Sequence, residues 1–84
     1  MKDVKVTVIS QRGHCAHGHK VGDTWTCGAV TPAGMCASAY NALYPYKAAL
    51  ATGGSFEWAN PDGSLDVACP DFQNPVVMRL SVVK

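Results

Sequence analysis

The segment from Thr31 to Leu50 carries the only long helical pattern of the sequence, and it constrains the fold more than any other feature. Apolar side chains recur there at spacings of three and four residues, in a stripe formed by Cys36, Ala39, Leu43, Tyr46 and Leu50. Thr31 suits the N-cap and Pro32 the first helical position, while the glycine pair 53–54 ends the pattern. We therefore expect one helix, which Pro45 either kinks or splits in two because proline lacks an N–H group.

Four shorter segments alternate apolar and polar side chains, which is typical of half-buried strands. They cover residues 2–10, 24–30, 64–69 and 76–83. The order β-β-α-β-β predicts a single α+β domain over residues 1–84, with the helix packed on one face of a mainly antiparallel sheet. Cys27 lies mid-strand between Trp25 and Ala29, and we interpret it as core filling.

The composition limits the partners of the protein. Only 15% of the 84 residues are charged, and such a thin charged shell leaves apolar patches that favour a homo-oligomer. The net charge of +1 and the lack of a basic cluster argue against nucleic-acid binding. No stretch approaches the roughly 18–20 apolar residues of a membrane span. The N-terminus alternates charge with valine, unlike a signal peptide, so we expect a cytoplasmic protein.

In a reducing cytoplasm, the four cysteines are expected to be free thiols, metal ligands or redox groups. Cys15 lies in a polar, glycine-containing loop with His14, His17 and His19. Cysteine and histidine are the usual ligands of zinc and of soft transition metals. The spacing matches no standard zinc motif, however, and a solvated loop with surface histidines is the alternative interpretation.

Cys36 and Cys69 also have two interpretations each. Cys36 lies in the first turn of the expected helix, where free amides and the helix dipole favour the thiolate of a nucleophile or ligand. It also begins the apolar stripe, as a core residue would. Cys69 ends a strand beside a loop, where sites are often assembled, but by alternation it follows Leu65 and Val67 into the core.

A joint site arises if the chain brings three element ends to one edge of the sheet. Cys15 precedes the second strand, Cys36 opens the helix and Cys69 closes the third strand. Three converging thiolates would suit zinc with His19 or His17 as a fourth ligand. They would equally suit a four-iron cluster with one open iron.

Short blocks spread over nearly the whole chain add a resemblance. They are Cys15 with Gly18–Asp23, then Thr31–Cys36, Ala42–Tyr46, Gly53–Phe56, Cys69–Asp71 and Asn74–Val77. With these blocks the chain resembles a group of small, functionally uncharacterised prokaryotic proteins that are common in anaerobes and archaea. The resemblance implies no activity. It does imply that the recurrent cysteines are Cys15, Cys36 and Cys69, with Cys27, His14 and His17 outside the pattern.

The leading hypothesis is a small cytoplasmic metal-binding protein. Cys15, Cys36 and Cys69 would hold zinc or an iron–sulfur cluster, with His19 as fourth ligand or supporting group. One alternative is a thiol-based redox or transfer enzyme that uses Cys36, with Cys15 or Cys69 as the resolving thiol. The other is a non-catalytic homo-oligomeric interaction module whose cysteines only fill the core. No small-molecule substrate is identified by the sequence.

Overall fold

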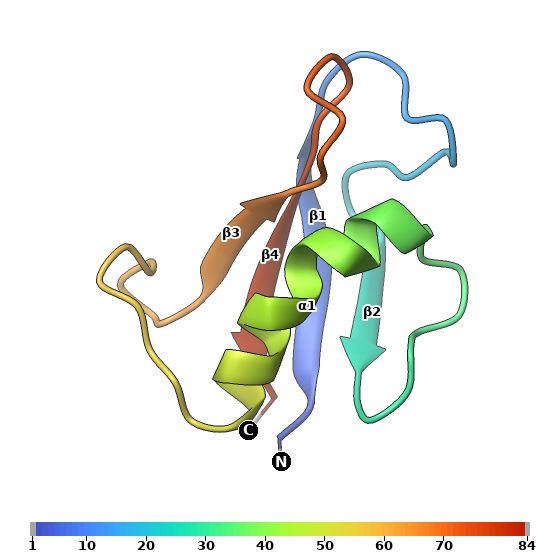
Figure 1. The fold of residues 1–84 in the computed structure, drawn as a ribbon. Coiled ribbons are helices and arrows are strands. Elements are labelled where there is room, and N and C mark those ends of the chain that lie inside the picture. Colours follow the sequence, from blue (N-terminus) through green and yellow to red (C-terminus); the bar gives the residue numbers. More distant parts are fainter. Residues whose placement is uncertain (1, 84) are drawn as a thin grey trace.

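In the computed structural model, which describes residues 2–83, an α-helix lies across one face of a four-stranded sheet (Figure 1). The elements in chain order are β1 (Val4–Gln11), β2 (Thr24–Cys27), α1 (Ala37–Ala51), β3 (Leu65–Ala68) and β4 (Val76–Val82). This confirms the predicted α+β class and the β-β-α-β-β order.

The strands lie in the order β2-β1-β4-β3, and every neighbouring pair is antiparallel. Since β1 and β3 are both antiparallel to β4, they run in the same direction. Gln11 at the end of β1 pairs with Val76, and Ala68 at the end of β3 pairs with the next residue, Val77. The chain therefore leaves β1 and β3 at the same end of the sheet.

The core lies between the sheet and the helix, as the alternation predicts. Val4, Val6 and Val8 of β1 are almost fully buried, and the residues between them are exposed or half-buried. The helix and the other strands complete the core with Ala39, Leu43, Leu50, Ala51, Leu65, Val76, Met78 and Leu80. On the opposite face Arg79 pairs with Asp66 at 2.8 Å.

The second strand is shorter than expected and ends at Cys27 instead of residue 30. The reason is its partner, because Cys27 pairs with Val4, where β1 begins. Within the described residues, which begin at residue 2, no strand lies beyond that point to continue the ladder. Cys27 itself is fully buried, which confirms its interpretation as core filling.

The expected helix start at residues 31–32 is wrong, because Cys36 is the N-cap and Ala37 is the first helical residue. Gly34 adopts a positive φ of 83° within a turn, so the backbone before Cys36 cannot be helical. The alternative of two helices is also wrong, since α1 is continuous through Pro45. Its axis bends along its length (Figure 1), which agrees with the expected kink. No helix in residues 2–83 is long and apolar enough to cross a membrane.

Candidate three-thiol site

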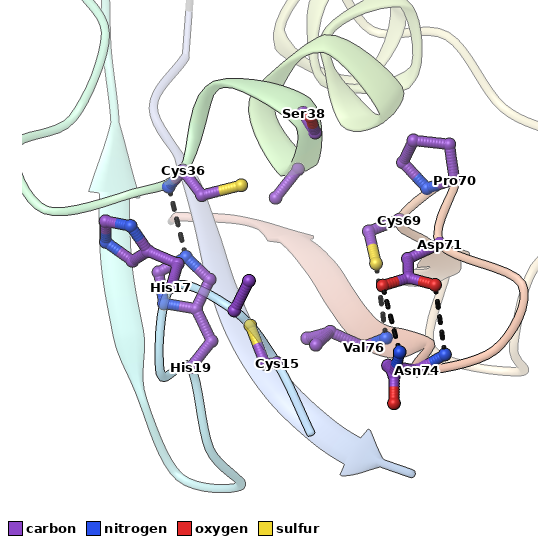
Figure 2. A pocket seen from close by; sticks show the side chains of 12 residues that line it. Cys15, His17, His19, Cys36, Ser38, Cys69, Pro70, Asp71, Asn74 and Val76 are labelled. Carbon is purple, nitrogen blue, oxygen red and sulfur yellow. Dashed lines mark hydrogen bonds between the residues drawn. The ribbon is translucent and has the colours of Figure 1, made fainter. Parts of the chain in front are cut away.

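A pocket of about 340 Å³ opens where the ends of β1 and β3 meet the start of α1 (Figure 2). Three thiols line it, and they come from three separate segments of the chain. The lining residues are Cys15, Ala16, His17, His19, Cys36, Ser38, Ala39, Cys69, Pro70, Asp71, Asn74 and Val76. We call this pocket the three-thiol site.

The topology explains why these three cysteines meet and the fourth does not. Cys15 follows β1 and Cys69 follows β3, and both strands end beside the start of β4. The irregular segment 28–36 returns the chain to the same end of the sheet, where Cys36 begins the helix. Cys27 pairs with Val4 at the opposite end of β1 and does not line the pocket.

His19 holds Cys36 in place through the backbone. The Cys36 amide donates a hydrogen bond to His19 Nε2 at 3.0 Å, and His19 is only 6% exposed. Because Nε2 accepts, the neutral ring carries its proton on Nδ1. Burial lowers the pKa of His19, the neighbouring His17 lowers it further, and Asp23 partly opposes both effects. His19 was expected as a ligand or supporting group, and its position in the structure is that of a support for the helix N-terminus.

Cys36 is partly buried, and as the N-cap it lies one residue before the helical turn in which we expected it. Its backbone is extended, with φ −65° and ψ 143°, and its side chain forms no capping hydrogen bond. The thiol points into the pocket (Figure 2). It is therefore not engaged in holding the helix end.

Cys69 and Cys15 are half-buried. The Cys69 thiol accepts a hydrogen bond from the Val76 amide at 3.3 Å, and the two residues also share a backbone bond of 2.9 Å. The Cys15 carbonyl accepts a bond from the Gly18 amide, which closes a tight turn in the loop. Both thiols thus lie on backbone that hydrogen bonds order locally.

A link between the two thiol-bearing loops was missed by the sequence analysis. Asn74 Oδ1 accepts a hydrogen bond from the His14 amide at 2.8 Å, across 60 residues of chain. A Cβ at Gly13, whose φ is +66°, would collide with that same oxygen. Asp71 orders the Asn74 side by accepting bonds from the Gln73 and Asn74 amides at 3.1 Å and from Asn74 Nδ2 at 3.3 Å. An aspartate that precedes free loop amides can be recognised in a sequence as a turn former. The contact between Asn74 and His14 leaves no such sign in the sequence.

The other two histidines differ in position. His17 Nε2 lies 3.2 Å from the Gly34 carbonyl, so this nitrogen carries the proton, and its ring packs 4.5 Å from that of His19. His14 is exposed and does not line the pocket. Within residues 2–83, no group of three or more His, Cys, Asp or Glu side chains is arranged as a ready metal site.

Lys47 is a second residue that the sequence analysis missed. It lies on the buried face of α1, only 4% exposed, and its Nζ donates a 2.6 Å hydrogen bond to the Gly28 carbonyl. Burial raises the pKa of the Cys27 thiol, and the positive charge of Lys47 lowers that pKa and so opposes part of the shift. The spacing held the signal, since Lys47 follows Leu43 by four residues and precedes Leu50 by three.

Comparison of the chain with protein-family models, with curated proteins and with solved structures finds no match. The functional interpretation of the pocket accordingly depends on its own residues and geometry.

Proposed function

We propose that the protein binds a metal centre, zinc or an iron–sulfur cluster, through Cys15, Cys36 and Cys69. The observation that carries the proposal is the meeting of these three thiols around one pocket, although they are far apart in the sequence. The one cysteine that lies elsewhere is fully buried in the core. Thiolates are the preferred protein ligands of both kinds of centre.

The donor set fits such a centre chemically. Each of the three thiols lies in a loop or at the end of a helix or strand, so its side chain can turn toward a shared ligand. A structural zinc ion would cross-link the three segments, whereas a cluster would add an electron carrier or a Lewis-acidic iron. A chain of 84 residues has a small core, and metal binding would contribute directly to its folding free energy.

The test is the metal and sulfide content per chain after purification without oxygen and without a metal-affinity tag, together with an absorption spectrum. We expect close to stoichiometric zinc, or iron with sulfide, and its loss in Cys15→Ser, Cys36→Ser and Cys69→Ser. Cys27→Ala is the matched control, because it removes a thiol outside the pocket and should keep the metal. A folded wild-type protein that binds neither zinc nor a cluster would contradict the proposal.

A thiol-based enzyme is the second candidate, and the free position of Cys36 favours it. The Cys36 thiol makes no capping bond and faces the pocket beside two further thiols. In this mechanism its thiolate attacks a substrate disulfide and forms a mixed disulfide. Cys15 or Cys69 then displaces the second substrate thiol, so that the substrate is reduced and the protein is oxidised. Rapid alkylation of Cys36 alone would favour the enzyme, whereas thiols that react only after addition of a chelator favour the metal centre.

The surface favours self-association, the basis of our third candidate. Trp58 is 54% exposed and packs against Tyr46 and Phe56, and Phe72 is 88% exposed on the loop after β3. Light scattering coupled to gel filtration distinguishes a homo-oligomer from a monomer of 8.9 kDa.

We also propose a cytoplasmic location, because all four cysteines are free thiols and a reducing compartment keeps them so. Cell fractionation tests this location.

A further inference from the structure

The polar side chains around the three-thiol site determine what can complete a metal centre there. Structural zinc sites are closed by four protein ligands, and catalytic ones leave the fourth position to water or substrate. A four-iron cluster held by three cysteines likewise leaves one iron open. The nature of the site therefore depends on whether His17, His19 or Asp71 can supply a fourth ligand.

His19 is engaged on the side that faces the site. Its Nε2 lone pair accepts the Cys36 amide, and its Nδ1 carries the remaining proton of the neutral ring. Ligation through Nε2 would leave the amide of the helix N-cap without this partner. Leaving a buried donor unsatisfied costs about 1–3 kcal/mol. The chain thus gains little by using His19 as a ligand.

Asp71 is engaged with both oxygens. Oδ1 accepts the amides of Gln73 and Asn74, and Oδ2 accepts the Asn74 side chain. Turning this carboxylate toward a metal would release the loop that carries Cys69. Figure 2 shows these bonds directed to the Asn74 side, away from Cys15 and Cys36.

His17 is the remaining competitor. Its Nε2 proton points to the Gly34 carbonyl, and only Nδ1 keeps a lone pair. The residue is exposed, and its ring packs on that of His19 and not among the thiols. Because His17 is exposed, water competes with a metal for its imidazole. His17 still lines the pocket, so the test has to exclude it as the fourth ligand.

We propose that the fourth position is filled from outside the chain by a small sulfur or nitrogen donor ligand, so that the centre is open and reactive. This inference rests on the metal centre proposed above. The pocket of about 340 Å³ has room for a molecule of several heavy atoms, given that one water occupies about 30 Å³ of liquid. Soft thiolate ligation favours a metal that accepts a further soft donor, and a small thiol is the best match.

The experiment loads the full chain with cobalt(II), whose visible bands report the ligands of a zinc-type site, and adds 2-mercaptoethanol or imidazole. We expect thiolate charge-transfer absorption from three sulfurs, and visible bands that shift saturably with either probe. X-ray absorption should show three sulfurs and one lighter ligand, which becomes four sulfurs with 2-mercaptoethanol. This measurement needs only the wild-type protein, so it does not depend on any variant folding.

His17→Ala and His19→Gln complete the design. We expect both to keep three sulfurs and the response to the probes. Cobalt absorption bands that do not shift with the probes in the wild type but shift in either variant would overturn the inference, because the histidine then supplies the fourth ligand. Absence of any thiolate charge-transfer absorption with cobalt, in a protein that also contains no iron and sulfide as purified, would instead contradict the metal centre itself, so the two failures are distinguishable.

Discussion

Asn74→Ala should uncouple the two loops that carry Cys15 and Cys69. The substitution removes the acceptor of the His14 amide and the donor to Asp71. A typical hydrogen bond contributes about 0.5–1.5 kcal/mol net, and the 3.3 Å bond to Asp71 belongs at the low end. We therefore expect the free energy of unfolding to fall by about 1–2 kcal/mol, with the loss concentrated in the Cys15 loop.

Two measurements test this expectation. Amide hydrogen exchange should be about tenfold faster at His14, since roughly 1.4 kcal/mol corresponds to a factor of ten, while the strands keep their protection. If the metal centre exists, metal affinity should fall by about 10–100-fold, the usual effect of removing a group that orients ligands. Gly13→Ala attacks the same contact from the other loop and should reproduce both changes.

Asn60→Ala is the matched control, because Asn60 also donates its side-chain amide, to Ser64 in the loop before β3 and to Asp66 in β3, but does not line the pocket. It should cost similar stability and leave His14 exchange and metal affinity unchanged. Equal effects of Asn60→Ala and Asn74→Ala on metal affinity would refute the reasoning, as would an unchanged His14 exchange rate in Asn74→Ala. Additive effects of Gly13→Ala and Asn74→Ala would also count against it, since residues in one contact should be non-additive.

Three further predictions concern pH, the buried lysine and metal binding. The pKa of His19 in the folded protein lies below its ordinary value of 6.5, so the unfolded chain binds more protons. The contribution of His19 to the free energy of unfolding should be fully present above pH 6.5 and should decrease as the pH falls through the folded pKa. Urea titrations should therefore show a weaker pH dependence in His19→Gln. Lys47→Met removes the charged donor to the Gly28 carbonyl, which alone should lower the free energy of unfolding by about 1.5–3 kcal/mol. The variant no longer buries a charge, so the net loss measured by urea unfolding should be smaller than that. Bound metal at 100 times its Kd should add about 2.7 kcal/mol and raise the melting temperature by roughly 10–20 °C, an increase absent in Cys36→Ser.

Local patterns predicted the strands and the core well. The alternation of Val4, Val6 and Val8 is a property of the pleat itself, and the structure buries all three. The helix start was wrong because two local signals conflicted. Thr31 and Pro32 favour an early start, but the positive φ of Gly34 forces a turn first. Which signal wins depends on the length of chain needed to return from the end of β2, and that length is a tertiary property.

The candidate site was predictable only in its list of residues. Three cysteines at the ends of helices and strands can be read from the sequence, but their meeting depends on β1 and β3 running in the same direction on either side of β4. The sequence carries no signal for that order. Nor could it show that His19 accepts from the Cys36 amide or that Asn74 reaches His14, because both contacts join distant parts of the chain.

These two contacts suggest how the site is held before any ligand binds. The loop after β1 is their common partner. Through His19 it is bonded to the helix start that carries Cys36, and through His14 to the loop that carries Cys69. Neither bond uses a thiol, so both position the backbone without engaging a sulfur; the Cys69 sulfur is engaged separately, by the Val76 amide. Removing the acceptor of either bond should thus disturb the two thiol-bearing segments that it joins, whereas a change at one cysteine should leave the other two in place.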